Sequence, residues 1–328
     1  MGRVAYSQGP GGITAGRALR ASRRAGRCAV RAALLCIALA LVGCGAERGD
    51  APTGREGTAV ARVVSLNPSL TAMLLAIGAR DVLVGVDSFS ARQQQAVADL
   101  PRVGGLFDPS LEAVLALEPD LVVVVPSAEQ RGFRERLSAL GIPVAVFDPK
   151  GFDDVVATLE ALGARVGHAE QAARRAAQMR ALRAAVAAYT AHLPRVEAVV
   201  VLQRDPLFVA GAATFVDDML AAVGARNLGA QRGDGWPRAS REWLIAAAPD
   251  VLVDTSRDPQ SAAAFWRQWP SIPAVADGRV VAVAEREMTL PGPWLDRALL
   301  ELLDAIRPGE RARFETAAGL RHVPETAR

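Results

Sequence analysis

The amino-acid sequence predicts an α/β protein with two similar lobes joined by one long rigid helix. Three observations support this fold class. Short apolar runs typical of buried strands alternate with helical patterns, which is the order found in parallel sheets. Landmarks of the first half recur in the second half at the same spacing. Between the halves lies an Ala- and Arg-rich segment, residues 166–192, with no proline and no glycine after Gly167.

The chain opens with the features of an export signal. Residues 1–44 contain seven arginines and no acidic residue, and an apolar run covers residues 32–42. A basic segment, a short apolar core and small residues before the cut mark such a signal. Leu41-Val42-Gly43 directly precedes Cys44, which resembles the lipobox of bacterial lipoproteins, where the cysteine is acylated and becomes the mature N-terminus. The sequence therefore predicts a lipoprotein signal peptide over 1–44.

A single transmembrane anchor is the alternative for this segment. A membrane span needs about 20 apolar residues, and the run over 32–42 is much shorter. We therefore expect an exported protein that works in the periplasm or at the cell surface, held on a membrane by a lipid on Cys44.

Removal of the leader changes the charge balance. The full chain has 38 basic and 35 acidic residues, so without the seven leader arginines 31 basic residues face 35 acidic ones. The basic excess belongs to the leader, and no nucleic-acid partner is indicated. All three cysteines lie at or before Cys44, so the mature chain can form no internal disulfide. Burial of apolar side chains must stabilise it.

Residues 45–58 are rich in Gly, Glu, Arg and Pro, lack periodicity and predict a flexible tether. The N-terminal lobe is placed at 59–165. Its elements are expected in this order: a strand over 60–66, a helix over 70–77, a strand over 82–86, a helix over 111–117, a buried strand over 121–125, a helix over 133–140 and a strand over 144–147.

The connecting helix is predicted over 166–193, because alanine and arginine have high helix propensity. At 1.5 Å per residue it would span roughly 35–40 Å, the length of a domain. Pro194 ends this helix, and a new strand is expected to begin at Val196. The C-terminal lobe is placed at 194–307, and a polar tail that starts as a helix is placed at 308–328.

The second lobe repeats the first. Four landmarks recur in order. Residues 73–80 match 219–226, and Pro119-Asp120 matches Pro249-Asp250. Glu112 and Glu242 each stand seven residues before the proline of that pair, and Ile142-Pro143 and Ile272-Pro273 follow it at equal distances. The repeat predicts two lobes with mainly parallel, Rossmann-like sheets and a ligand cleft between them.

A lipobox, two repeated lobes and a connecting helix resemble the substrate-binding proteins of ABC importers for cobalamin, siderophores and heme. The resemblance covers residues 60–305 and rests on residues 62–69, 103–122 and 236–244. It implies a monomeric protein that performs no chemistry and delivers its ligand to a permease dimer with its ATPase. It also implies no cofactor of the protein's own, since the ligand carries cobalt or iron.

The resemblance assigns permease docking to Glu112 and Glu242. In this family one glutamate on each lobe meets arginines of the permease dimer, and Arg–carboxylate pairs give orientation as well as attraction. The residues alone also allow a local role. Each glutamate is expected in the first turn of a helix, where the helix dipole favours a carboxylate by roughly 0.3–1 kcal/mol. The two interpretations are compatible.

A corrin or heme is a large apolar ring and requires aromatic walls. Four aromatic residues at predicted strand ends or loops are candidates: Phe89, Phe107, Phe208 and Trp236. By position, Phe89, Phe208 and Trp236 resemble ring-contacting residues of the cobalamin-binding members, whereas Leu106 stands where their pattern has an aromatic residue. Cobalamin or another corrinoid is the expected ligand.

A ferric siderophore or heme is the alternative ligand. An anionic siderophore would need an arginine cluster, and four arginines are available: Arg204, Arg232, Arg238 and Arg286. Arg238 and Arg286 join the four aromatic residues as the predicted ligand contacts.

Two other protein classes fit less well. A receptor for a free metal ion would need several histidines in its cleft, and the chain has only His168, His192 and His322. A secreted two-lobe enzyme would need a catalytic motif, and no nucleophile elbow, P-loop or dinucleotide fingerprint is present. The adjacent acids at 153–154 and 217–218 are expected to be solvated or to cap helices.

Overall fold

The computed structural model describes residues 60–127, 131–256, 258–284 and 288–320. The predicted signal peptide with Cys44, the tether, Arg286 and His322 therefore lie outside the described residues. Within the described ranges, no helix combines the length and the apolar character that crossing a membrane would require.

The N-terminal lobe contains a four-stranded parallel sheet with the strand order β2-β1-β3-β4. All four residues of β3 are buried, as expected for a parallel strand covered on both faces. The elements are β1 (Val63–Ser65), α1 (Pro68–Ala76), β2 (Leu83–Val86), α2 (Ser88–Gln93), the 3-10 helix η1 (Gln95–Val97), α3 (Leu111–Leu115), β3 (Leu121–Val124), α4 (Arg131–Ala139) and β4 (Val144–Val146). Every predicted strand and helix of this lobe is confirmed, and α2 and η1 are additions.

The C-terminal lobe contains a five-stranded sheet with the order β6-β5-β8-β9, and β7 also pairs with β5. Only β6 runs antiparallel to its neighbour, which confirms the mainly parallel prediction. The elements are β5 (Val196–Arg204), β6 (Leu207–Val209), α7 (Phe215–Ala222), β7 (Ala225–Asn227), the 3-10 helix η2 (Leu228–Arg232), α8 (Arg241–Ala247), β8 (Val251–Asp254), α9 (Pro259–Trp266), α10 (Pro273–Ala276), β9 (Val280–Ala282), α12 (Leu295–Ile306) and α13 (Glu310–Ala317).

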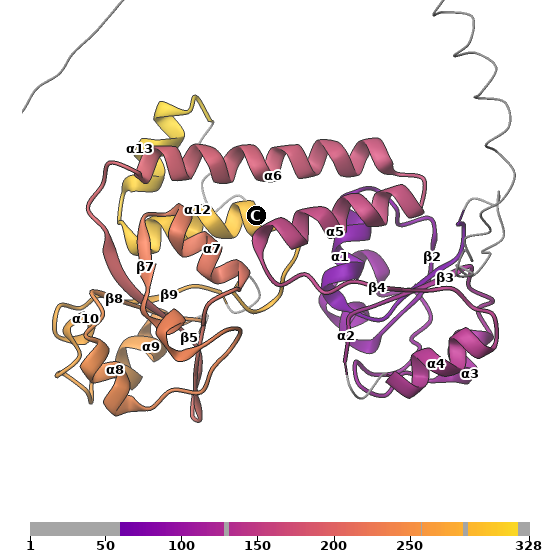
Figure 1. Ribbon diagram of the computed structural model, residues 1–328, viewed down its shortest axis with the longest axis horizontal. Helices are drawn as coiled ribbons and strands as arrows, with labels where there is room; N and C mark the ends of the chain where they lie inside the picture. The colour runs from indigo at the N-terminus through magenta and orange to yellow at the C-terminus, as the bar shows by residue number, and fades with distance from the viewer. Residues whose placement is uncertain (1–59, 128–130, 257, 285–287, 321–328) are drawn as a thin grey trace, which may run out of the picture. The chain divides into compact units, whose positions relative to one another are not determined.

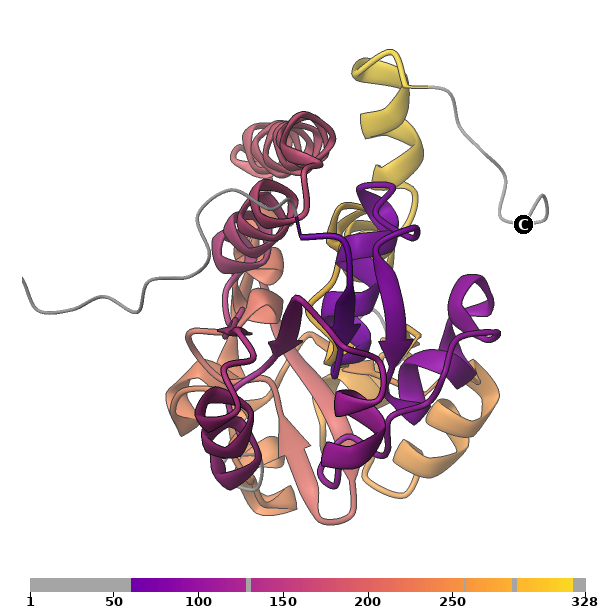
Figure 2. The ribbon, with the colours of Figure 1, turned by 90° about the vertical axis from the view of Figure 1, so that its right-hand side faces the viewer.

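The connection between the lobes uses two helices where the sequence predicted one. α5 (Phe152–Arg165) precedes α6 (Ala169–Thr190), and Gly167, with a φ of 78°, forms the turn between them. Figure 1 shows α6 above both lobes with α5 beneath it, and Figure 2 shows the same stacking with α6 seen nearly end-on. The prediction of one helix over 166–193 is therefore correct for α6 and incomplete for the connection.

Contacts beside the connecting helices also couple the lobes. The Phe215 N–H donates to the carbonyl of Lys150 at 2.7 Å, and the Phe152 N–H donates to the carboxylate of Asp218 at 2.7 Å. One apolar core runs from Met73 of the N-terminal lobe through α5 to Leu302 of the C-terminal lobe. The lobes therefore share a core as well as a covalent link.

The internal repeat is confirmed at three of its four landmarks. α1 and α7 both end before a glycine with positive φ, Gly78 and Gly224. Asp120 accepts the Arg62 N–H at 3.0 Å, and in the second lobe Asp250 accepts the Glu197 N–H at 2.8 Å. The fourth landmark is not structurally equivalent: residue 143 leads directly into β4, whereas residue 273 is the first residue of α10 and β9 begins seven residues later.

Candidate functional site

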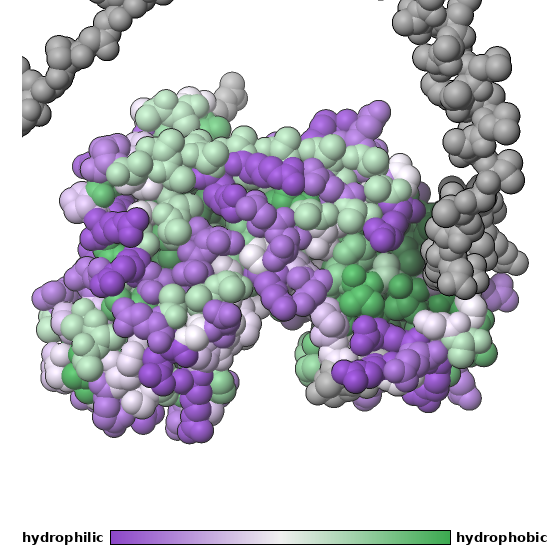
Figure 3. All heavy atoms as spheres, viewed as in Figure 1, coloured by the Kyte–Doolittle hydropathy of each residue, from purple (hydrophilic) through white to green (hydrophobic). Residues whose placement is uncertain are grey.

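A cavity of about 580 Å³ lies where the lobes meet. Its wall comes from segments of both lobes: residues 148–150 after β4, 213–215 at the start of α7, 234–236 in the loop before α8, and Thr289 and Pro291. Figure 3 shows the surface hollowed between the lobes below α5. Ligands of α/β proteins bind outside the carboxyl ends of parallel strands, and β4 ends immediately before the 148–150 segment.

Trp236 is the predicted ligand residue that lines this cavity. Its indole packs edge-to-face on Phe215, with 5.8 Å between ring centroids, and the residue remains 39% exposed. The loop that carries it is fixed by paired backbone bonds between Ala212 and Gly235 and their neighbours. A Cβ at Gly211 would lie 2.2 Å from the Gly233 carbonyl oxygen, so only glycine permits this close approach. The loop thus holds an exposed aromatic ring at the cavity.

Phe208 and Arg238 lie beside each other in the same lobe. Phe208 is half-buried in β6, a strand absent from the sequence-based expectation, and its backbone is bridged to that of exposed Arg238. Bonds from the Val209 N–H to Pro237 and from the Ala239 N–H to Leu207 extend this pairing. The structure therefore brings Phe208 and Arg238 close to the Trp236 loop, but outside the residues of the cavity wall.

Phe89 and Phe107 lie in the N-terminal lobe and do not line the cavity. The prediction of a strand end or loop for Phe89 is wrong, because Asp87 caps α2 by accepting the N–H groups of Phe89 and Ser90 at 2.8 and 2.9 Å. Phe107 lies in the turn before α3, as predicted, and is 63% exposed. Among the described residues six large apolar side chains are exposed, and Phe89, Phe107 and Trp236 are three of them.

Two of the candidate arginines, Arg204 and Arg232, contact side chains of their own lobe. Arg204 is occupied by Asp254, with Nε–Oδ2 and Nη2–Oδ1 distances of 2.9 Å. The Arg232 guanidinium lies 5.7 Å from the ring centroid of Trp243. Arg286 lies outside the described residues. Sequence spacing cannot reveal the pair of Arg204 with Asp254, because 50 residues separate the two.

The cavity wall carries three charged residues that the sequence analysis did not select. These are Asp148, Lys150 and Asp234. Lys150, the only lysine of the chain, pairs with Asp148 at 2.9 Å, and that hydrogen bond raises the pKa of its ammonium group. The position of residues 148–150 just after a parallel strand is the signal that could have identified them.

Glu112 and Glu242 occupy matching positions on α3 and α8. Both are exposed, and both lie in the first turn of their helix, which confirms the position expected from the sequence. The hydroxyl oxygens of Ser110 and Ser240 cap these helices at 3.2 and 3.1 Å. Hydrogen bonds from its own backbone N–H and from Ser240 hold the pKa of Glu242 below its ordinary value. In Figure 1, α3 and α8 both lie at the lower end of the view, away from α6.

The adjacent acids have structural partners, and one of those partners is the helix cap that the sequence predicts. Asp154 accepts the Gly151 N–H at 2.9 Å, and Asp153 pairs with Arg183. Asp217 accepts from the Asn227 amide at 3.0 Å. In the part of the chain that the structure describes, no three His, Cys, Asp or Glu side chains are grouped as a metal site would require.

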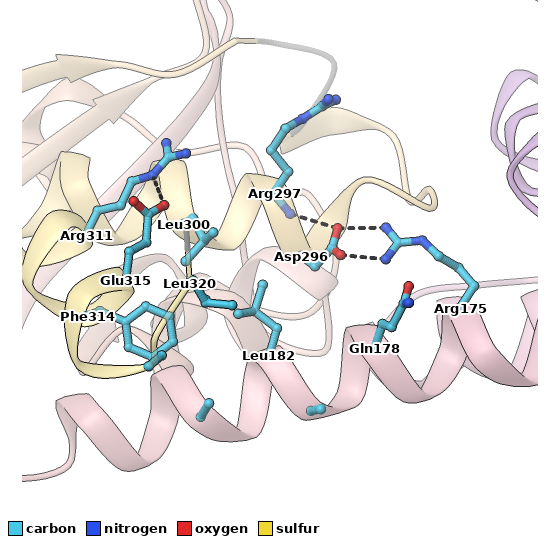
Figure 4. A pocket seen from close by; sticks show the side chains of 13 residues that line it. Arg175, Gln178, Leu182, Asp296, Arg297, Leu300, Arg311, Phe314, Glu315 and Leu320 are labelled. Atoms are coloured by element: carbon cyan, nitrogen blue, oxygen red, sulfur yellow. Dashed lines mark hydrogen bonds and ion pairs between the residues drawn. The ribbon is translucent and has the colours of Figure 1, made fainter. Parts of the chain in front are cut away.

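A second cavity, of about 640 Å³, lies between α6, α12 and α13 and contains none of the predicted site residues. Figure 4 shows Arg175 of α6 paired through both guanidinium nitrogens with Asp296 of α12. Leu182 and Phe314 contribute apolar wall nearby. The pair joins the connecting helix to the C-terminal lobe.

Comparison with known proteins places the fold in a family. The periplasmic binding protein model matches residues 63–287. The chain is 30% identical over 221 residues to the vitamin B12-binding protein of Yersinia pestis (strain Pestoides F), which covers 66% of this chain and 78% of that relative.

Two solved structures share the fold. The periplasmic heme-binding protein of Roseiflexus sp. RS-1 in apo form is 28% identical, with a TM-score of 0.65 over 76% of this chain and 98% of that one. The periplasmic vitamin B12 binding protein of Vibrio cholerae is 23% identical, with a TM-score of 0.66 over 76% and 97%. With a family model that spans both lobes, the chain belongs to the periplasmic binding protein family.

Proposed function

We propose that the protein captures cobalamin or another corrinoid and delivers it to the permease of an ABC importer. Members of this family are exported solute-binding proteins rather than enzymes, and they work with a permease and its ATPase. The observation that carries the ligand proposal is the exposed indole of Trp236 at a cavity between the lobes. An exposed aromatic face suits a large flat ring. The protein is proposed to act as a monomer without a cofactor of its own.

The charges at the cavity favour a corrinoid over a dianionic porphyrin. Two carboxylates, Asp148 and Asp234, face one ammonium group, that of Lys150. The peripheral amides of a corrin can donate hydrogen bonds to carboxylates, whereas the two propionates of heme would be repelled by them. Arg204 offers little compensation, because Asp254 already occupies its guanidinium. Heme remains the second candidate, because the structure that is 28% identical is a heme-binding protein.

Calorimetry with cyanocobalamin, heme and a ferric hydroxamate tests the ligand. We expect cyanocobalamin to bind most tightly, and Trp236→Ala to weaken it at least tenfold, a loss of about 1.4 kcal/mol. Leu140→Ala is the matched control, because Leu140 is also exposed and apolar but does not line the cavity. Tighter binding of heme than of cyanocobalamin would reject the corrinoid assignment.

We further propose that Glu112 and Glu242 dock the protein to its permease. Two exposed carboxylates on helices with the same cap, one on each lobe, can address the two halves of a dimer. Charge-assisted pairs with arginine would then fix the orientation of the complex. Phe89, Phe107, Phe208, Arg238 and Arg286 stay proposed ligand contacts in addition to Trp236.

The membrane attachment proposed for Cys44 has a direct test. Cys44→Ser should move the exported protein from the membrane fraction to the soluble fraction, because no thiol remains to be acylated at the lipobox. Cys36→Ser is the matched control, since Cys36 lies within the apolar run and should not affect attachment. Retention of Cys44→Ser in the membrane fraction would instead favour the transmembrane anchor.

A further inference from the structure

The two glutamate-bearing corners share one backbone design. We call residues 108–113 the N-corner and residues 238–243 the C-corner; they lie 130 positions apart. Each contains a serine cap, and each residue of 111–120 has the same class of exposure as its counterpart in 241–250. A partner would therefore meet two surfaces with the same cap and the same pattern of exposed positions.

The charges on these two corners differ. Leu111 of the N-corner is matched by Arg241 of the C-corner, and Asp108 is matched by Arg238. The N-corner thus presents two carboxylates, whereas the C-corner surrounds its one carboxylate with two guanidinium groups. A strict repeat of function would not require this exchange of charge.

Arg241 is held in place on the lobe without an ion pair among the described residues. Its guanidinium lies 5.0 Å from the ring centroid of Trp269, and its buried Nε has no hydrogen-bond partner. Stacking on an aromatic face leaves the edges of a guanidinium available for a carboxylate. The Arg241 side chain is therefore oriented, positively charged and able to bind an anion of a partner.

Resting on the proposed docking role of Glu112 and Glu242, we propose that Arg241 binds a carboxylate of the permease, beside the basic group that receives Glu242. A permease surface that was only basic would be repelled by Arg241 at the C-corner. A surface with an acidic group next to its basic group complements the C-corner fully. In a two-fold symmetric permease the same acidic group meets Leu111 at the N-corner and gains no ion pair there.

Two substitutions that exchange the matched residues test this asymmetry. Binding of the ligand-loaded full protein to the purified permease–ATPase complex in nanodiscs is measured for Arg241→Leu and for Leu111→Arg. We expect Arg241→Leu to weaken docking about tenfold and Arg241→Lys to retain most of it. Leu111→Arg should tighten docking, since it offers the second permease half the missing cation. Arg174→Leu on α6 is the control for loss of one exposed arginine.

The outcomes separate this inference from the docking proposal. Unchanged or tighter docking of Arg241→Leu would overturn the proposed carboxylate contact. If reversal of Glu112 and Glu242 also leaves docking unchanged, the docking role itself is wrong. Binding of cyanocobalamin and thermal unfolding are measured for each variant, and Arg241→Gln replaces Arg241→Leu if the latter does not fold. A loss of cyanocobalamin binding without a loss of docking would place Arg241 with the ligand and reject the inference.

Discussion

Reversal of both proposed docking carboxylates, Glu112→Arg with Glu242→Arg, should abolish ligand uptake while leaving ligand binding intact. Each substitution removes a charge-assisted pair and places like charges together at the permease. Hydrogen bonds to charged groups contribute about 1.5–3 kcal/mol each, so two losses weaken docking by at least about 100-fold. Neither glutamate lines the cavity between the lobes, so the affinity for cyanocobalamin should not change.

Two measurements separate docking from capture. Uptake of labelled cyanocobalamin is followed in cells that carry the variant as their only copy, and calorimetry gives the affinity of the purified protein. Glu135→Arg with Glu170→Arg is the matched control, because both residues are exposed and lie on other helices, α4 and α6. Loss of cyanocobalamin binding together with uptake would contradict a pure docking role.

Most of the fold could be predicted because both lobes use local signals. Apolar runs without alternation predict the parallel strands, and the repeat of residues 73–80 at 219–226 predicts that α7 matches α1. Two of the elements missing from the prediction, α2 and β6, have weaker local signals. α2 is short and is fixed by a buried cap, Asp87, and β6 depends on antiparallel pairing with β5. Such tertiary pairing has no fixed spacing in the sequence.

The candidate site could be predicted only where a local motif carries it. Trp236 was found through its glycine-rich loop and is at the cavity. The ion pair of Arg204 with Asp254 could not be predicted, because the pairing of β5 with β8 brings these two residues together. Lys150 cannot be predicted as a site residue, because one lysine among many arginines has no motif. Its place in the cavity wall depends on the contact between the segment after β4 and the start of α7.

Asp254→Asn should destabilise the protein more than any other single carboxylate substitution proposed for it. Asp254 is buried at the end of β8 and accepts hydrogen bonds from Arg204, from the Trp266 indole at 2.7 Å and from the Ser256 N–H at 3.0 Å. Asparagine removes the charge and places an NH2 group against these donors. Breaking a buried ion pair costs about 3 kcal/mol, measured as a loss in the free energy of unfolding by urea at pH 7.

The destabilisation caused by Asp254→Asn should decrease as the pH falls. Burial by itself raises the pKa of Asp254, but hydrogen bonds from Arg204, Trp266 and Ser256 outweigh it and hold the pKa below the ordinary value of 3.8. A carboxylate whose pKa is lower in the folded state adds stability above its unfolded pKa and loses that contribution as pH falls. The difference between wild type and Asp254→Asn should therefore be largest at neutral pH and shrink below pH 3.8.

Asp99→Asn separates burial from ion pairing in this argument. Both carboxylate oxygens of Asp99 accept from one guanidinium nitrogen of Arg80, Nη2, at 2.9 Å. This is again an Asp–Arg pair with two hydrogen bonds, but the Asp99 side chain is 73% exposed. Solvent screens an exposed pair, so its loss should change the unfolding midpoint little. Equal destabilisation by the two substitutions would show that burial of the carboxylate does not decide the size of the loss. A much larger loss of unfolding free energy for Asp254→Asn would establish that burial makes the Asp254–Arg204 pair strongly stabilising where β5 and β8 end.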